Sequence, residues 1–206
     1  MQVIDGVFRD PYRIRSLALK QEYGRTADID YNWPGYRSLI DETLENQYLE
    51  IMKKRVNDST LQIQHLYFQW IPAEWVQGCF HTDPCKYTAV TFLTPDPPSN
   101  TGTQIGEVVD YHSNYQKMVN ERFSVQDNFM RIGKEPFYRM NKKGFFYRNI
   151  FKIVSQRYNS KFKNPCTISN QFNRTVFFDS PKLHRAQNFF GKELKDSRLT
   201  LVGFFN

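Results

Sequence analysis

The sequence predicts an α+β fold that is mainly β, in which helices pack against a β-sandwich. Three patterns support this prediction. Amphipathic helical patterns occupy residues 1–60, alternating strand patterns occupy residues 61–110 and 167–206, and a mostly helical, basic insertion separates them at residues 111–166. Because these segments together supply one set of packed layers, we expect a single domain over residues 1–206.

The N-terminal part carries two helix signals. Asp10 precedes Pro11, and this order is typical of a helix start because Asp caps the free amide groups and Pro fits the first helical position. Apolar residues then recur at helical spacing to about Tyr23. Residues 24–36 contain Asp, Asn, Pro and Gly and are predicted to form a loop, and a second helix is predicted over residues 41–56.

Strand patterns begin after the turn residues 57–59. The run LQIQHLYFQWI is rich in β-branched and aromatic residues, and PDPPSNTG is a cluster of turn residues between two later strands. The predicted strands are residues 61–71, 87–94, 103–109, 167–170, 175–179 and 198–205.

Composition excludes several classes of protein. Hydrophobic residues make up 40% of the chain and charged residues 24%, which is ordinary for a globular protein and excludes wholesale disorder. No apolar run reaches the roughly 18 residues of a membrane span, and no apolar secretory segment opens the sequence, so we expect a cytoplasmic protein without membrane contact. The three Cys residues show no CxxC spacing, which argues against a disulfide scaffold or a zinc knuckle.

Positive charge is concentrated in one segment. Residues 115–165 hold twelve Lys and Arg against three acidic residues, a net charge of +9, whereas the rest of the chain holds 16 basic and 18 acidic residues, a net charge of −2. This segment could be a hydrated surface, or it could attract an anionic substrate or partner. We expect it to take part in substrate selection.

His81 and Asp83 form the first candidate metal-binding pair. In an extended segment, residues i and i+2 point to the same face, so an imidazole and a carboxylate can converge on one ion. A third ligand must come from elsewhere, and His184 follows a strand that is predicted to be buried. Two His and one carboxylate are the ligands of non-haem Fe(II) oxygenases, which keep further positions open for substrates.

Arg198 and Thr200 share one face of the last predicted strand, opposite Leu199 and Leu201. A guanidinium beside a hydroxyl inside a β-sandwich suits the distal carboxylate of a dicarboxylic acid. A cation on an otherwise apolar strand would be costly without such an anion. Alternatively, Arg198 could pair with a structural carboxylate such as Asp83 or Asp179.

These motifs together resemble the Fe(II)- and 2-oxoglutarate-dependent dioxygenases, in particular the small prolyl-hydroxylase-like members. The similar segments are YTAVTFLTPDPPSNTGTQI after the His-x-Asp pair, NRTVFFDSPKLHRA around the distal His, and the closing strand RLTLVGFF. The resemblance implies a double-stranded β-helix, or jelly roll, and an enzyme that hydroxylates a C–H bond. It does not interpret residues 115–165.

The resemblance also implies the ligands and their roles. His81, Asp83 and His184 would bind Fe(II) and form the catalytic centre. The cosubstrate 2-oxoglutarate would chelate the metal, place its distal carboxylate on Arg198 beside Thr200, and react with O2 to give succinate and CO2. A carboxylate at position 83 favours hydroxylation, because halogenating members leave that position open for a halide.

Other interpretations remain open at this stage. Tyr67 resembles a tyrosine that contacts 2-oxoglutarate, but its spacing from His81 is unusual and core packing explains it equally well. The substrate is expected to be a small molecule or a peptide, with an anionic group as one option. Oxidative demethylation of a nucleic-acid base is a less favoured alternative that rests on Phe145-Phe146-Tyr147 beside Lys142-Lys143. A jelly-roll binding protein without catalysis is the third alternative.

Overall fold

The computed structural model describes most of the chain outside the basic insertion. The described residues are 1–24, 34–75, 77–108, 131–132, 135–136, 149–150, 152–153, 155–156, 159–160 and 162–206. No helix in this part of the chain is long and apolar enough to cross a membrane.

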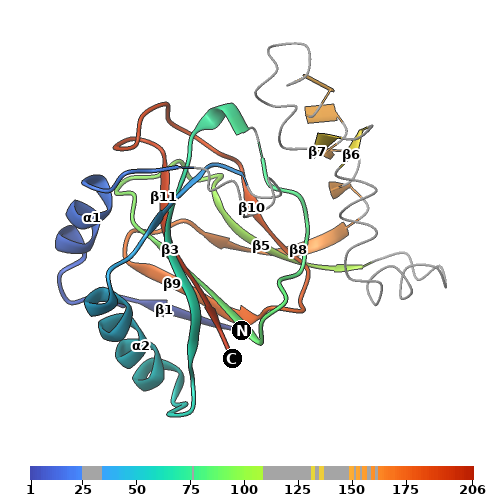
Figure 1. Ribbon diagram of the computed structural model, residues 1–206. Helices are drawn as coiled ribbons and strands as arrows, with labels where there is room; N and C mark the ends of the chain where they lie inside the picture. The colour runs from blue at the N-terminus through green and yellow to red at the C-terminus, as the bar shows by residue number, and fades with distance from the viewer. Residues whose placement is uncertain are drawn as a thin grey trace.

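Two antiparallel sheets form the body of the protein (Figure 1). The larger sheet has six strands in the order β1 (Gln2–Asp5), β9 (Arg174–Asp179), β4 (Tyr87–Phe92), β11 (Arg198–Phe205), β3 (Ile63–Ile71) and β2 (Tyr36–Leu39). The smaller sheet has three strands in the order β10 (His184–Gln187), β5 (Gly102–Val108) and β8 (Phe162–Ser169). A short 3-10 helix (Ala73–Trp75) and a two-residue pair, β6 (Arg131–Ile132) and β7 (Glu135–Pro136), complete the described elements.

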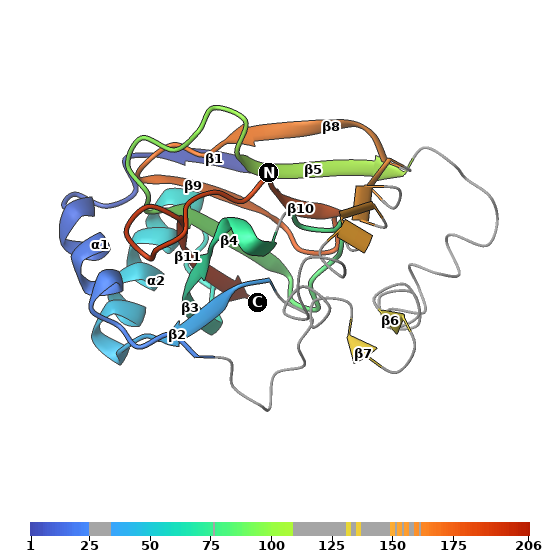
Figure 2. The same cartoon turned by 90° about the horizontal axis from the view of Figure 1, so that it is seen from above.

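Both N-terminal helices pack on one face of the larger sheet, and the smaller sheet covers the other face (Figures 1 and 2). In α1 (Pro11–Leu19), the carboxylate of Asp10 accepts a hydrogen bond from the Arg13 amide at 3.1 Å. In α2 (Glu42–Val56), Asp41 caps the helix start in the same way at 2.9 Å. These bonds satisfy backbone donors that a helix start leaves free, which is why both helices begin where the sequence predicts.

Strand β11 lies inside the larger sheet, between β3 and β4. Its side chains alternate between the two faces. Leu199, Leu201 and Phe205 join the core under the helices, whereas Arg198 and Val202 face the space between the sheets. All eight residues of the strand are buried, so β11 carries the main core on one face and presents the site on the other.

The chain alternates between the sheets in a regular way. It passes from β3 in the larger sheet to a bridge between His81 and His184 beside β10, and then to β4. It continues to β5 and β8 in the smaller sheet, and then through β9, β10 and β11, which alternate between the two sheets. This path places the segment before Asp83 next to β10 at the open end of the space between the sheets.

The structure corrects four boundaries of the prediction. Residues 1–60 contain two strands, β1 and β2, besides their helices, and β2 begins inside the segment predicted as a loop. Strand β8 begins at Phe162, inside the range assigned to the helical insertion, and β10 was not predicted as a strand. These strands depend on partners far away in sequence, as β1 does on β9, so local patterns predict them poorly. Most of the basic insertion lies outside the described residues.

Candidate metal and cosubstrate site

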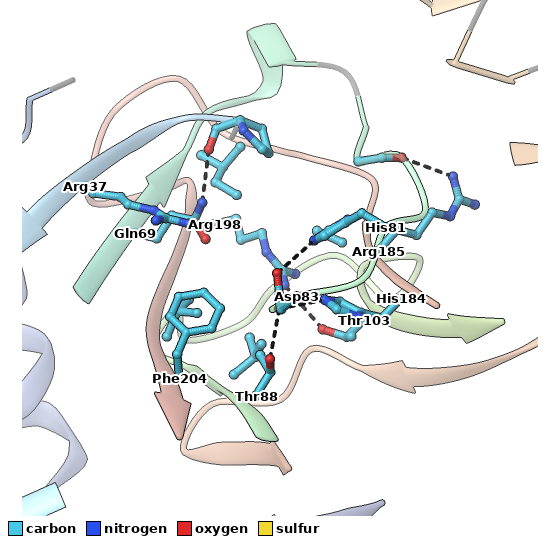
Figure 3. Close-up of a pocket in the computed structure, with 16 residues that line it drawn as sticks. Arg37, Gln69, His81, Asp83, Thr88, Thr103, His184, Arg185, Arg198 and Phe204 are labelled. Carbon is cyan, nitrogen blue, oxygen red and sulfur yellow. Dashed lines mark hydrogen bonds and ion pairs between the residues drawn. The ribbon is translucent and has the colours of Figure 1, made fainter. Parts of the chain in front are cut away.

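Three side chains meet at one point between the sheets. The candidate ligand atoms of His81, Asp83 and His184 all lie within 4.8 Å of one another. The Nε2 atom of His184 lies 3.1 Å from Asp83 Oδ2, and the Nε2 atom of His81 lies 3.9 Å from Asp83 Oδ1. Figure 3 shows the two imidazole rings and the carboxylate pointing toward one another. The structure therefore brings together the three residues that the sequence predicts as metal ligands.

Backbone carbonyl groups fix the orientation of both imidazole rings. The Nδ1 atom of His81 lies 2.8 Å from the carbonyl oxygen of Cys79, and the Nδ1 atom of His184 lies 2.8 Å from that of Lys182. A carbonyl oxygen only accepts, so each Nδ1 carries a proton, and in the neutral form of each ring the Nε2 atom keeps a lone pair. Such outer hydrogen bonds are typical of metal-binding His residues. Both lone pairs are thus available to one ion.

The carboxylate of Asp83 is buried but not fully satisfied. Its Oδ2 atom accepts a hydrogen bond from the Thr88 hydroxyl at 2.9 Å, whereas its Oδ1 atom is buried and has no hydrogen-bond partner. A buried carboxylate oxygen without a partner is costly, and a metal ion would remove that cost. This orphaned oxygen, with the two Nε2 atoms, fits a divalent metal that accepts nitrogen and oxygen ligands.

The protonation states also suit a metal ion, because ligands must bind in their deprotonated forms. Burial and the charge of His184 lower the pKa of His81 to about 4, so this imidazole is neutral near pH 7. Burial raises the pKa of Asp83, but His184, His81 and the Thr88 hydroxyl outweigh burial and hold the pKa at about 2. Asp83 is therefore ionised at neutral pH.

Arg198 lies in the same cavity and is only 2% exposed. Its Nη1 atom donates to the Gly102 carbonyl at 3.0 Å, its Nη2 atom lies 3.5 Å from the Thr103 hydroxyl, and its Nε atom has no hydrogen-bond partner. Burial lowers the pKa of Arg198 to about 9, which still leaves it charged at neutral pH. Asp179, an acid near the site in sequence, pairs instead with Lys182 at 2.7 Å.

No ion pair joins Arg198 to an acidic residue in the part of the chain that the structure describes. The suggestion that Arg198 pairs with Asp83 is therefore not supported, since the near neighbours of Asp83 are the two His residues and Thr88. A buried guanidinium without a carboxylate carries a desolvation penalty that an anionic ligand would offset.

The cavity has a volume of about 70 Å³ and opens to solvent. Its lining combines the three candidate ligands and Arg198 with other residues from six strands and with Pro34 and Gly78, which lie outside the strands. The lining residues are Pro34, Arg37, Gln69, Ile71, Gly78, His81, Asp83, Thr88, Val90, Thr103, His184, Arg185, Ala186, Arg198, Val202 and Phe204.

Tyr67 and Thr200, which the sequence predicts as cosubstrate contacts, are not part of this lining. Thr200 is buried two residues after Arg198 on β11, and its hydroxyl lies 3.5 Å from the Gln69 carbonyl oxygen. Tyr67 packs against Val202 and Phe204. Their contact with the cosubstrate remains a prediction.

Sequence reasoning did not select three residues of this site. Arg37 comes from β2, a four-residue strand that begins at the last residue of the predicted loop, and Thr88 and Thr103 look like ordinary strand residues. Side chains alternate between the two faces of a strand, and this alternation along β4 could have indicated that Thr88 faces the cavity beside Val90. The residues behind the nucleic-acid alternative, Lys142 to Tyr147, lie outside the described residues.

Comparison with known proteins gives no match by sequence, either to a protein-family model or to a curated protein. Solved structures do match by shape. The chain resembles HygX from Streptomyces hygroscopicus with nickel and 2-oxoglutarate bound, at a TM-score of 0.55 and 8% identity over 99% of this chain and 81% of that one. A Pseudomonas putida prolyl-4-hydroxylase matches at a TM-score of 0.51 and 14% identity, over 100% and 91% of the two chains.

The chain has the fold of the Fe(II)- and 2-oxoglutarate-dependent oxygenases. A third neighbour agrees: SnoN, a non-heme alpha-ketoglutarate-dependent epimerase from nogalamycin biosynthesis, matches at a TM-score of 0.51 and 11% identity over 98% of this chain and 76% of that one. The prediction of a mainly β fold with two N-terminal helices is therefore confirmed.

Proposed function

We propose that the protein is an Fe(II)- and 2-oxoglutarate-dependent oxygenase that hydroxylates a C–H bond of a small-molecule or peptidyl substrate. One observation carries the proposal: a buried His-Asp-His cluster shares a cavity with a buried Arg that has no carboxylate partner among the described residues. The cluster fits a divalent metal, and the Arg fits the free end of a dicarboxylic acid. The fold supports the same assignment.

His81, Asp83 and His184 would hold Fe(II), each through the atom that the structure leaves available. When bound with 2-oxoglutarate, the metal supplies the activation of O2 that yields succinate, CO2 and a hydroxylated product. Asp83 keeps one ligand position occupied, which favours hydroxylation over halogenation. Thr88 donates to the Oδ2 atom of this carboxylate, so the Oδ1 atom, which has no hydrogen-bond partner, would be the ligand to the metal.

Arg198 would bind the distal carboxylate of 2-oxoglutarate. The Gly102 carbonyl and the Thr103 hydroxyl hold one end of the guanidinium, and the Phe92 ring lies 5.1 Å from its central carbon. These contacts limit the rotamers of Arg198, so little side-chain entropy is lost when the carboxylate binds. Thr200 and Tyr67 are proposed to support the cosubstrate from beside the cavity.

The two sheets are proposed to be the halves of a double-stranded β-helix. Support comes from the strict alternation of β9, β10 and β11 between the sheets and from the His81–His184 bridge, which adds the segment before Asp83 to the smaller sheet. This arrangement brings ligands from distant parts of the sequence to one open end of the sandwich.

We also propose that the substrate carries an anionic group that contacts Arg37. Arg37 enters the cavity from β2, on the side away from the two His residues (Figure 3), and its guanidinium carbon lies 5.1 Å from the ring centre of Tyr67. Asp83 is the single acid among the described lining residues, whereas Arg37, Arg185 and Arg198 are cations.

Charge balance supports this proposal. A divalent metal and doubly charged 2-oxoglutarate cancel each other, so among the described lining residues three Arg against Asp83 leave two excess positive charges. Arg185 is held by neutral oxygen acceptors of Gln104, Gln77 and Gly78. A substrate anion bound on the side of the cavity away from the two His residues would lie near Arg37. Two neighbours bind small molecules in their structures, hygromycin B in HygX and nogalamycin RO in SnoN, and this supports a small-molecule substrate class.

Succinate release from 2-oxoglutarate tests the proposed function. Wild-type protein with Fe(II) and O2 should release succinate, and a panel of candidate substrates should accelerate release, with carboxylate or phosphate compounds more effective than their neutral amides or alcohols. Asp83→Ala should abolish release. Equal release by wild-type and Asp83→Ala protein would refute the metal assignment, and equal acceleration by anionic and neutral compounds would refute the role of Arg37.

A further inference from the structure

The segment that carries His81 is held by a buried network from the end of the basic insertion. The side chain of Asn159 is 8% exposed and makes two hydrogen bonds to this segment. Its Oδ1 atom accepts from the Phe80 amide at 3.2 Å, and its Nδ2 atom donates to the Gly78 carbonyl at 3.0 Å. Gln77, the residue before Gly78, donates to the Ser155 hydroxyl at 2.9 Å.

One peptide group connects Asn159 to His81. The Phe80 N–H and the Cys79 C=O belong to the same peptide bond, which is planar and trans, because the structure has no cis peptide in its described part. Asn159 holds the N–H end of this group, and His81 Nδ1 donates to the C=O end at 2.8 Å. The chain of contacts therefore runs from the Asn159 amide through one rigid group to the imidazole.

This arrangement has two physical consequences. Because the peptide group is rigid, fixing its N–H fixes the direction of its carbonyl oxygen, and so the plane and tautomer of the His81 ring. Hydrogen bonds in a chain also polarise one another in a low-dielectric interior, so a bond to the N–H strengthens the acceptor at the other end. When the Cys79 carbonyl oxygen is a stronger acceptor for the Nδ1–H group, the Nε2 atom of His81 becomes a better electron-pair donor to a metal.

We propose that Asn159 is a positioning residue for the metal centre, acting on His81 through the Cys79–Phe80 peptide group. The proposal rests on the proposed function, since it takes His81 as a metal ligand. It assigns a structural role to the C-terminal end of the insertion, whose basic charge by itself indicates only a part in substrate selection. Ser155, which is fully buried, and Gln77 brace the same segment from the same side.

Asn173 offers a matched control. Its side chain makes the same pair of bonds, accepting from the Phe8 amide at 2.9 Å and donating to the Phe8 carbonyl at 2.8 Å, but it ties down the N-terminal segment. Asn159→Ala and Asn173→Ala therefore remove equivalent bonds, and only the first should change the metal centre. Asn159→Asp keeps an acceptor for the Phe80 amide and loses the donor to Gly78.

The experiment measures Co(II) and Zn(II) dissociation constants of the full chain, the ¹⁵N shifts of His81 in the metal-free protein, and stability in urea. Asn159→Ala should weaken metal binding at least tenfold and shift the His81 signals toward a mixture of tautomers. Asn159→Asp should remain within about threefold of wild type in metal affinity, since it keeps the bond that faces His81. Asn173→Ala should lose stability with an unchanged metal affinity.

Three results would overturn the inference. These are a wild-type metal affinity in Asn159→Ala, unchanged His81 signals in that variant, or an equal loss of metal affinity in Asn173→Ala. If Asn159→Ala does not fold, a tenfold loss of affinity in folded Asn159→Asp overturns the inference, and near wild-type affinity supports it. Failure of wild-type protein to bind either metal would instead refute the proposed function, so the two failures are distinguishable.

Discussion

The carbonyl oxygen of Gly102 accepts a hydrogen bond from the buried guanidinium of Arg198 at 3.0 Å. Gly102 opens β5 and pairs with Ser169 of β8, so the smaller sheet sets the position of this oxygen. Arg198 stands on β11 in the larger sheet. The bond therefore connects the two sheets at the place where the proposed cosubstrate binds, and both residues can be tested separately.

Replacement of Gly102 should disturb both the fold and the cosubstrate site. A Cβ at this position would overlap the Ile168 carbonyl of the neighbouring strand, so the backbone must move. We expect Gly102→Ala to lower the free energy of unfolding by about 1–3 kcal/mol and to weaken 2-oxoglutarate binding. Gly24→Ala is the control, because a Cβ there meets nothing within 4 Å. Equal stability of the two variants in urea would contradict this explanation.

Replacement of Arg198 should separate ligand binding from stability. The Arg198 guanidinium is buried without a carboxylate among the described residues, so Arg198→Met should leave the ligand-free protein as stable as wild type or more stable. Saturating 2-oxoglutarate at about 100 times its dissociation constant should stabilise metal-loaded wild type by about 2.7 kcal/mol. The Met variant should show no such gain in thermal unfolding. A similar gain in both proteins would place the anchor elsewhere.

The Thr88 hydroxyl should tune the metal affinity through Asp83. Thr88 donates to Asp83 Oδ2 at 2.9 Å, and Thr88→Val removes this bond while keeping the side-chain shape. We expect metal binding to weaken roughly 10- to 100-fold, which is usual when a ligand loses its outer hydrogen bond. Thr91→Val, whose hydroxyl bonds Tyr48 and Thr175, should keep the wild-type metal affinity. Competition titration with a chelator measures both, and equal affinities would argue against Thr88 as a support.

Acid should destabilise the metal-free protein through His81. Its folded-state pKa is lowered to about 4 by burial and by His184, against about 6.5 in the unfolded chain. Between these values the unfolded state binds a proton that the folded state does not, so stability falls as the pH falls from about 6.5 to 4.

We expect this loss to be on the order of 2 kcal/mol between pH 7 and pH 4.5. His81→Gln should remove it, whereas His65→Gln, at an exposed position on β3, should keep it. Urea unfolding with a chelator present measures the loss, and a wild-type pH dependence in His81→Gln would show that another group is responsible.

Much of the fold could be predicted because local chemistry determines it. Asp10 with Pro11 and Asp41 define two helix starts, and the alternation of Arg198 with Leu199 along the last strand matches β11 over its whole length. The short strands β1, β2 and β10 could not be predicted, since each is stabilised by a partner more than twenty residues away.

The same distinction applies to the site. His81 and Asp83 were predictable because residues i and i+2 of an extended segment share a face, and His184 and Arg198 because their surrounding strands resemble those of a known family. The proposed roles of Arg37 and Asn159 depend on contacts with residues far away in sequence, and neither residue stands in a motif. Their roles become visible only when the fold brings them together.

Calorimetric titration of 2-oxoglutarate under anaerobic conditions tests the paired roles of the metal ligands and Arg198. We expect one 2-oxoglutarate to bind each metal-loaded wild-type chain. Binding should be lost in Asp83→Ala, which lacks the metal, and should weaken at least 100-fold in metal-loaded Arg198→Met, because a buried charge pair loses one partner. Equal binding to wild type, Asp83→Ala and Arg198→Met, or no binding to metal-loaded wild type, would contradict both roles.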